Sequence, residues 1–288
     1  MKILVTGANG YIGQGVVSKL IDNGHDVVAT DFCLNRVDKR AVLQTCNLFE
    51  ATNPYLTFEK PDILLHLAWR DGFKHDSETH LLDLPMHYQF IRRAIESGIH
   101  RICVMGSMHE IGFHEGVVTA DTPANPQSLY GISKNALRQS ISALQAEKKF
   151  EFLWMRGFYI VGNNRYGCSI FSKIQDAAEK GQAKFPFTSG ENQYDFIDYS
   201  DFCDQIATAA CKVGETGIIH CCSGKPMKLK QRVEQFLLEN HYNIELEFGK
   251  FPDRPYDSKA IWGDNTRILQ LMGDKSEKFK YDNFNDGI

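Results

Sequence analysis

A tyrosine and a lysine stand four residues apart in the segment YGISK, at Tyr130 and Lys134. On a helix this spacing places both side chains on one face. An ordinary tyrosine has a pKa of about 10 and is a poor base at neutral pH, but a neighbouring ammonium group favours the phenolate and lowers that pKa. The pair is therefore a candidate general acid and base. The same spacing also occurs by chance on solvated helix surfaces. The neighbouring sequence therefore has to distinguish a catalytic pair from an exposed tyrosine and lysine.

Ser107 stands 23 residues before Tyr130, just after the apolar run Arg101–Met105. That run is typical of a buried strand. In parallel α/β sheets, ligands gather beyond the carboxyl ends of the strands. A serine at such an end is placed to hydrogen-bond the same substrate oxygen as the tyrosine.

The segment VTGANGYIG carries glycines at Gly7, Gly10 and Gly13. It lies between a predicted strand, Lys2–Thr6, and a predicted helix, Ile12–Asn23. That context is the one in which a glycine loop binds a dinucleotide. The first glycine permits a sharp turn, the second lets the backbone approach a pyrophosphate, and the third lets the helix pack closely on the sheet. The helix N-terminus then faces the anion.

An acidic residue, Asp31, follows Gly13 by 18 positions, at the end of a second predicted strand, Asp26–Thr30. A carboxylate there suits a ribose 2′-hydroxyl and repels a 2′-phosphate. Arg36 is near enough in sequence to weaken that preference. We therefore expect NAD as the cofactor, with NADP possible.

The other predicted elements continue the alternation of strand and helix. They are the strands Ile63–Leu67, Arg101–Met105 and Phe152–Arg156 and the helices Pro85–Ser97 and Leu129–Lys148. This βαβα pattern predicts an α/β fold with a doubly wound parallel (Rossmann) sheet. After about residue 162 the pattern loosens. We expect a dinucleotide-binding domain over 1–162 and a smaller C-terminal α/β substrate lobe over 163–288, with an approximate boundary and a chain that can cross between the lobes.

Composition excludes several classes of function. The 288 residues carry a formal net charge of −4 and show no basic stripe, which argues against nucleic acid as a partner. No apolar run reaches the length of a membrane helix or a signal peptide. The eight cysteines are scattered and form no CxxC pair, so free thiols in the reducing cytoplasm are expected. His109, Glu110 and His114 resemble a zinc signature, but the spacing is one residue too long, and no metal is expected.

Several motifs together resemble the extended short-chain dehydrogenase/reductase superfamily, and within it the NAD-dependent epimerase/dehydratase family. The glycine spacing is one; HLAW at 66–69 resembles the family's HLAA, Asn47-Leu48 stands where Asp-Leu is usual, and RPYD at 254–257 resembles RPxD. The resemblance implies that Tyr130 is the general acid/base, Lys134 its partner and Ser107 the donor to the substrate oxygen. It also implies a set of cofactor contacts: Gly7, Asn9, Gly10, Tyr11, Ile12, Gly13, Asp31, Asn47, Leu48, Leu67, Ala68, Tyr130 and Lys134.

The resemblance further implies a nucleotide-sugar substrate, a homodimer built on the helices at 85–97 and 129–148, and a place in polysaccharide biosynthesis. Its substrate contacts fall on Ser107, Met108, His109, Tyr159, Arg254 and Asp257. Two usual diphosphate contacts are changed, because Tyr159 replaces an asparagine and Tyr194 an arginine. Three phenylalanines, Phe171, Phe185 and Phe187, are more typical of core than of base stacking.

The residues after Ser107 bear on the reaction. Family 4,6-dehydratases carry an Asp-Glu pair there, whereas this chain has Met108-His109. Without that acid and base, water elimination is disfavoured. We expect redox chemistry at a sugar-ring carbon, by a 4-ketoreductase in preference to an NAD-dependent 4-epimerase. A non-catalytic dinucleotide-binding protein is a further alternative, which the presence of all three catalytic residue types disfavours.

Overall fold

The computed structural model describes residues 1–288 except 163–164, 166, 168, 253–256 and 278–288. Its centre is a sheet of seven parallel strands in the order β11-β7-β5-β4-β1-β2-β3. The strands are β1 (Lys2–Thr6), β2 (Asp26–Asp31), β3 (Val42–Thr45), β4 (Ile63–His66), β5 (Arg101–Ser107), β7 (Glu151–Gly157) and β11 (Gly217–Cys221). The chain adds β2 and β3 on one side of β1 and then β4 and later strands on its other side, and this reversal of strand order is the switch point where such sheets bind ligands.

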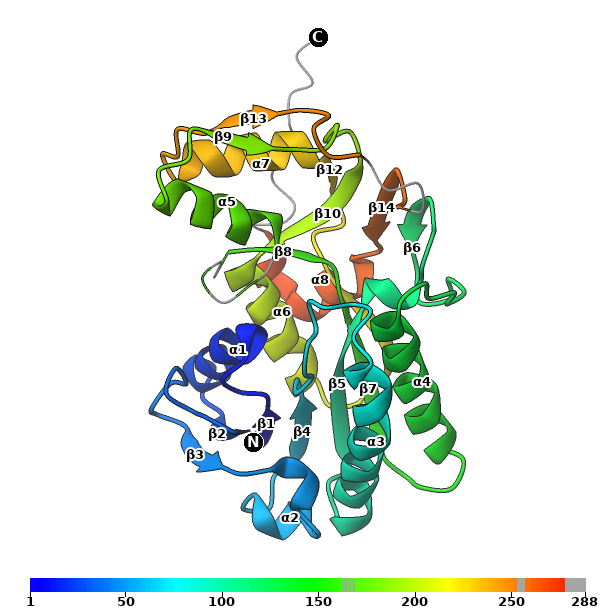
Figure 1. The fold of residues 1–288 in the computed structure, drawn as a ribbon. Coiled ribbons are helices and arrows are strands. Elements are labelled where there is room, and N and C mark those ends of the chain that lie inside the picture. The colour runs from blue at the N-terminus through cyan, green and yellow to red at the C-terminus, as the bar shows by residue number, and fades with distance from the viewer. Residues whose placement is uncertain (163–164, 166, 168, 253–256, 278–288) are drawn as a thin grey trace.

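Helices cover both faces of this sheet (Figure 1). One face carries α1 (Tyr11–Asp22), α6 (Tyr199–Cys211) and α8 (Thr266–Met272). The other carries α3 (Thr79–Ser97) and α4 (Leu129–Leu144). Short elements complete this part: α2 (Pro54–Thr57) and the 3₁₀ turns η1 (Leu48–Glu50), η2 (Met108–Glu110) and η4 (Gly273–Ser276). Because the central strands are apolar on both sides, each face has its own buried core. The predicted doubly wound α/β fold is confirmed.

A smaller lobe lies beyond the large sheet, at the top in Figure 1. Its main sheet runs β12-β10-β14-β6, and β8 pairs with β10. The strands are β6 (Gly116–Val118), β8 (Tyr159–Val161), β10 (Gln193–Asp198), β12 (Pro226–Lys228) and β14 (Ala260–Gly263). A second pair, β9 (Lys184–Pro186) with β13 (Glu245–Glu247), accompanies helices α5 (Ile170–Glu179) and α7 (Leu229–Glu239). Their packed residues form a separate core that includes Phe171 and Phe187, with Phe185 against it.

The chain passes between the two lobes more than once. Strand β6 belongs to the smaller sheet although it precedes residue 162, and α6, β11 and α8 return to the large sheet after it. This is the crossing that the sequence analysis allowed. The division at residue 162 stays a prediction.

Helix α3 begins earlier than expected. The predicted helix runs over Pro85–Ser97, but the observed helix starts at Thr79 and contains Pro85. A proline inside a helix removes one hydrogen bond to the carbonyl four residues before it, here that of Leu81. Leu81 is exposed, so water can reach that carbonyl. The predicted end was right, because Gly98 closes the helix in the left-handed region at φ +118°.

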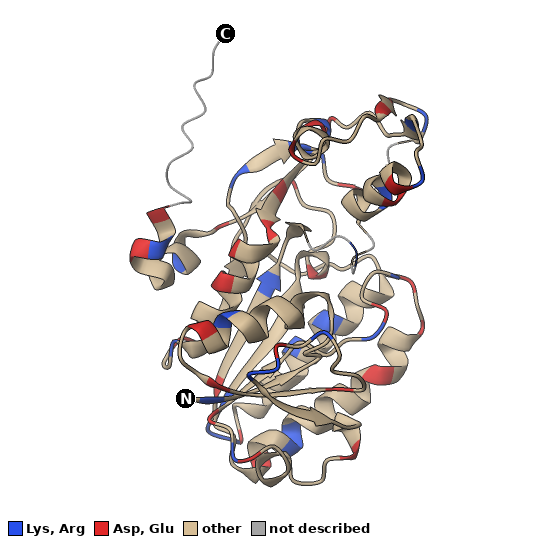
Figure 2. Cartoon of the chain, turned by 90° about the vertical axis from the view of Figure 1, so that its left-hand side faces the viewer, with Lys and Arg blue, Asp and Glu red and all other residues tan. Residues whose placement is uncertain are grey.

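Basic and acidic residues are interspersed along the described elements (Figure 2). Within those elements, no helix combines the length and apolar character needed to cross a lipid bilayer.

Candidate active site

The glycine loop has the geometry of a phosphate cradle. Gly7 adopts φ +69°, and a Cβ there would come within 2.6 Å of the Ala68 backbone. A Cβ on Gly13 would lie 2.2 Å from the carbonyl oxygen of Gly7. Helix α1 starts directly after Gly10 and has no acidic residue in its first turn. Its N-terminal N–H groups are therefore available to an anion, so the loop fits a dinucleotide pyrophosphate.

Two other predicted cofactor residues, Tyr11 and Ile12, form the first turn of α1. The Tyr11 hydroxyl donates to the carbonyl of Gly162 at 2.6 Å, which ties the start of α1 to the end of β8. Ile12 packs against the core of the α1 face. The Tyr199 hydroxyl donates to the Tyr11 carbonyl at 2.7 Å. Both residues thus fix the start of the helix against the second half of the chain.

Asp31 lies at the end of β2 beside the glycine loop. Its carboxylate accepts a hydrogen bond from the Asn9 backbone at 3.0 Å and another from the Phe32 backbone at 2.7 Å. Arg36 approaches the same loop, because its backbone N–H donates to the Asn9 side chain and its guanidinium to the Asn9 carbonyl. The acidic group therefore lies beside the glycine loop with a cation nearby, and its contact with the ribose stays a prediction.

The other predicted cofactor residues lie around this loop. Ala68 follows β4 and packs against Gly7, and Leu67 joins the core of the α1 face. Asn47 caps η1, where its side chain accepts from Phe49 at 3.2 Å. Leu48 is buried in the core of the α3 face. The observed contacts of Leu48 are therefore those of a core residue.

Ser107, Tyr130 and Lys134 come together at the carboxyl end of β5. Ser107 ends that strand, and the other two stand in the first turns of α4. The Ser107 side chain is close enough to the Tyr130 phenol to lower its pKa. Lys134 is 3% exposed, and its ammonium group donates to the Met105 carbonyl at 2.8 Å. The three predicted catalytic residues thus form one cluster beside the glycine loop.

The electrostatics of this cluster differ from the prediction that Lys134 lowers the pKa of Tyr130. Burial raises the pKa of Tyr130 to about 12, although the hydrogen bond from Ser107 lowers it. The physical reason is that the phenol is removed from water while the ammonium group points to Met105. Burial also lowers the pKa of Lys134 to about 7, against an upward pull from Glu110.

Glu110 holds the Ser107 end of this cluster in place. Its carboxylate accepts from the Ser107 backbone at 2.7 Å and from the Trp154 indole at 2.9 Å. Arg156 donates to it at 3.2 Å, and Arg138 lies 3.8 Å away. Glu110 and Arg156 are fully buried, so the pair fixes Ser107 at the strand end.

The sequence analysis did not give Glu110 this role. Ser107-x-x-Glu110 is a capping-box signature, and the structure contains that box at η2. That signal was present, but Glu110 was considered only as part of a zinc pattern. In the described part of the chain, no group of three or more His, Cys, Asp or Glu side chains is arranged to hold a metal ion.

Four aromatic rings among the described residues lie near Tyr130. His75 stacks on it at 5.2 Å between ring centroids, and its carbonyl accepts from the Tyr130 backbone at 2.8 Å. His80 lies at 5.2 Å, His109 at 6.1 Å and Trp69 at 6.3 Å from the same ring. Of these only His109 was predicted. No spacing pattern pointed to the others, which the packing of α3 against α4 brings in.

The predicted substrate residues are only partly brought together. Met108 is buried in a small core that also contains Tyr194, with Tyr159 packed against it. The rings of Tyr159 and Tyr194 lie 4.5 Å apart between centroids. Asp257 is half-buried, and Arg254 lies outside the described residues. An aromatic pair therefore occupies the positions of two expected polar contacts.

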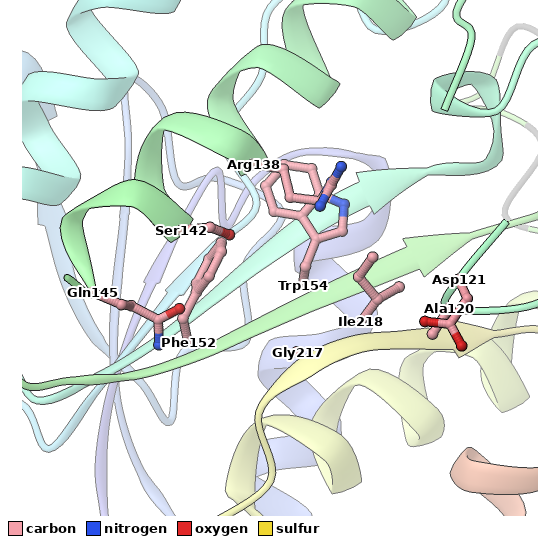
Figure 3. Close-up of a pocket in the computed structure, with 9 residues that line it drawn as sticks. All are labelled: Ala120, Asp121, Arg138, Ser142, Gln145, Phe152, Trp154, Gly217 and Ile218. Carbon is pink, nitrogen blue, oxygen red and sulfur yellow. The ribbon is translucent and has the colours of Figure 1, made fainter. Parts of the chain in front are cut away.

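A separate cavity of about 280 Å³ lies between the later turns of α4 and the edge strand β11 (Figure 3). Arg138, Ser142 and Gln145 line it from α4. It shares Trp154 with the Glu110 cluster but contains none of the predicted catalytic or cofactor residues. This cavity is distinct from the candidate active site.

The fold and the site define the class of protein: a dinucleotide-dependent enzyme with a Rossmann sheet. Residues 3–221 match the NAD dependent epimerase/dehydratase family. A dTDP-6-deoxy-L-talose 4-dehydrogenase (NAD(+)) of Aggregatibacter actinomycetemcomitans is 41% identical over 271 residues, covering 91% of this chain and 99% of that protein. The chain therefore belongs to the NAD-dependent epimerase/dehydratase family, and its cofactor is NAD.

More distant relatives share the full-length architecture. A GDP-6-deoxy-D-talose 4-dehydrogenase of the same organism is 22% identical, with 95% of this chain and 92% of that protein covered. The UDP-glucose 4-epimerase of Thermotoga maritima, solved with UDP-glucose, superposes with a TM-score of 0.80 at 20% identity, covering 94% and 92% of the two chains. The UDP-glucose-4-epimerase of Stenotrophomonas maltophila, solved with bound NAD, gives 0.82 at 17% identity, covering 95% and 92%. These structures support the fold.

Proposed function

We propose that this enzyme is an NAD(H)-dependent 4-ketoreductase of a nucleotide-activated 6-deoxyhexose, which interconverts the C4 hydroxyl and the C4 ketone of the sugar. The observation that carries the proposal is the cluster of Ser107, Tyr130 and Lys134 beside the glycine loop. The 41% identity to a dTDP-6-deoxy-L-talose 4-dehydrogenase supports both the position and the sugar class.

The residues divide the work as follows. NAD(H), held by the glycine loop and Asp31, supplies or accepts the hydride when it is bound. Tyr130 keeps its proton at neutral pH because its pKa is about 12, which suits it to protonate the ketone oxygen as that oxygen gains negative charge. Ser107 donates a second hydrogen bond to the same oxygen. Lys134 would hold the cofactor ribose with the N–H groups that its bond to Met105 leaves over, and its ammonium group lies 5.9 Å from the centroid of the Tyr130 ring.

Features around Ser107 favour reduction over two related reactions. Met108 and His109 replace the acid and base that a dehydratase needs. An epimerase must let its keto intermediate turn over within the cleft. Tyr159 and Tyr194 fill this region with a packed aromatic pair, which favours a substrate held in one pose. The alternative is an NAD-dependent 4-epimerase.

The test supplies dTDP-6-deoxy-L-talose with NAD⁺ and follows the appearance of NADH absorbance together with the 4-keto sugar. We expect one NADH per sugar oxidised. Interconversion of two 4-epimers by the purified protein without added cofactor would instead establish the epimerase. Neither reaction, with NAD still bound tightly, would support a non-catalytic dinucleotide-binding protein.

We further propose a homodimer in the cytoplasm that serves polysaccharide biosynthesis. The exposed apolar side chains on α3 and α4 support the dimer: Leu81, Leu82, Met86 and Ile132. Leu137 and Ile141, also on α4, are buried against the sheet and do not contribute to that surface. The seven described cysteines are free, in keeping with a reducing compartment. Light scattering at micromolar concentration should give the mass of a dimer, and a monomer would overturn this part.

A further inference from the structure

Trp69 stands directly after Ala68, at the carboxyl end of β4, and has no assigned part in the chemistry. Its side chain is half-buried and packs against the core of the α3 face. The indole lies close to both Tyr130 and Lys134. The sequence at this point, HLAW, has an indole where the resembling motif, HLAA, has a methyl group. A side chain of that size beside the catalytic cluster needs a physical account.

The Lys134 ammonium group lies 4.0 Å from the centroid of a Trp69 ring. It donates a hydrogen bond to the Met105 carbonyl, and within the described residues no carboxylate lies within ion-pair distance of it. Glu110 acts on it through space. The face of an indole attracts a cation, most strongly where water is excluded. Trp69 therefore joins the Met105 carbonyl and, at 5.9 Å, the Tyr130 ring in offsetting the burial of this charge.

Trp69 is itself fixed in orientation. Its indole N–H donates to Nδ1 of His80 at 3.0 Å, and Nε2 of His80 lies 2.9 Å from the Lys74 carbonyl. Nδ1 must accept from the indole, so the proton of His80 sits on Nε2 and donates to Lys74. The ring also stacks on His87 at 4.5 Å between centroids and 16° between planes. Two imidazoles from one side of α3 thus hold the indole against Lys134.

Four other titratable groups in the described structure face Lys134: His66, His87, Glu110 and Tyr130. His66 and His87 are joined Nε2 to Nδ1 at 2.9 Å, and Thr6 hydrogen-bonds the far side of His66 at 2.8 Å. Burial lowers the pKa of His66 to about 3 and that of His87 well below its usual range, so both stay neutral and add no competing cation. Glu110 and the Tyr130 phenol complete the set.

We propose that Trp69 is a positioning residue for the reaction, which keeps Lys134 protonated and aimed at the cofactor ribose through the face of its indole. This rests on the proposed role of Lys134. Loss of the aromatic face should make the ammonium less stable. The basic limb of the rate–pH profile should then move to lower pH, while the KM for the sugar stays unchanged, because Trp69 acts through Lys134.

The experiment compares Trp69→Leu with Trp69→Phe in the full-length chain, with Lys134→Met as reference. Trp69→Phe keeps an aromatic face and should stay within a few-fold of wild type. Trp69→Leu should lose on the order of tenfold in kcat at neutral pH and shift the basic limb downward. Equal rates and equal pH profiles for the two Trp69 variants would overturn the inference. A wild-type rate for Lys134→Met would overturn the proposed function of Lys134 instead.

A second measurement avoids any change of packing. The protein is produced with fluorinated tryptophans, which weaken the negative face of the indole while nearly preserving its shape. The chain has three tryptophans, so the Trp69→Phe variant grown the same way reports the effect of the other two. We expect the basic limb to move to lower pH with each added fluorine in the wild type only. An unchanged limb in the wild type, or an equal shift in both proteins, would overturn the inference.

Discussion

Each of the two lobes buries a charged side chain, and the two side chains differ in how many hydrogen-bond partners they have. Asp195, on β10 of the smaller lobe, is completely buried. Its carboxylate accepts from the backbone and hydroxyl of Ser223 at 2.8 and 2.6 Å, from the Gly224 backbone at 2.9 Å and from the Gly263 backbone at 3.1 Å. These four donors tie β10 to the turn after β11 and to β14.

Lys134, at the edge of the large sheet, has far fewer partners. An ammonium group carries three N–H donors, and the hydrogen bond to the Met105 carbonyl uses one. Trp69 covers it with a ring face, which accepts no conventional hydrogen bond. Asp195 is thus saturated and serves the architecture, whereas Lys134 keeps donors for a ligand. A buried charged group with unused hydrogen-bond donors therefore distinguishes the candidate active site from the structural cluster around Asp195.

The largest expected effect is on the reaction itself. Tyr130→Phe removes the proton donor and should lower kcat by roughly 10²–10⁴-fold, with NADH affinity nearly unchanged. Steady-state kinetics and a fluorescence titration of NADH measure the two quantities. A wild-type rate in this variant would show that the proton comes from another group. It would also show that the cluster around Lys134 is not the catalytic site.

At the structural end, Asp195→Ala should destabilise the smaller lobe. Each buried N–H left without an acceptor costs about 1–3 kcal/mol, so the free energy of unfolding should fall by at least about 3 kcal/mol. The matched control, Asp195→Asn, keeps one acceptor oxygen and should recover part of that loss. Urea unfolding measures both. An alanine variant as stable as wild type would mean that the four hydrogen bonds do not hold the lobe.

A third variant tests whether the Lys134 charge opposes folding. Its pKa is about 7 in the folded state and 10.5 in the unfolded chain. The unfolded chain therefore binds more protons between these values, and this group's cost to stability is full below pH 7 and disappears toward pH 10.5. Lys134→Met should gain stability over wild type. The gain should shrink by about 1.4 kcal/mol per pH unit above pH 7. Urea unfolding at several pH values checks this, and a pH-independent difference would contradict it.

The parts of the site that depend on local sequence were predictable. The glycine loop follows from the spacing of Gly7, Gly10 and Gly13 between a strand and a helix, and the shared face of Tyr130 and Lys134 follows from helical periodicity. In these cases the relevant contacts span only a few residues. Local spacing therefore located both the glycine loop and the Tyr130–Lys134 pair, whose roles stay predictions.

The surroundings of Lys134 could not be predicted in the same way. Trp69 contacts Lys134 from the segment after β4. His80 reaches Trp69 and Tyr130 because α3 starts at Thr79, before Pro85. That start lies in a polar stretch without a strong cap, and the proline pointed to a later one. The pKa of Tyr130 likewise depends on burial, which four residues of sequence do not reveal. Tertiary packing, not spacing, determines both.

The smallest expected effect concerns cofactor choice. Asp31 should favour NAD(H) over NADP(H), because a carboxylate beside the 2′ position repels a phosphate. Asp31→Ala should lower that preference by on the order of tenfold, a limited change because Arg36 already lies beside the loop. Fluorescence titration of both cofactors measures the ratio. Tighter NADP(H) binding by wild type, unchanged in the variant, would remove the role of Asp31.

The central claim is that this enzyme transfers one hydride to C4 of its sugar and then releases the oxidised cofactor. The most direct test supplies a dTDP-4-keto-6-deoxyhexose with NADH deuterated at the transferring carbon. The account predicts that each turnover consumes one equivalent of NADH and leaves one deuterium on sugar C4, as mass spectrometry and NMR would show. Conversion of the sugar without consumption of NADH, or a product without deuterium at C4, would contradict it.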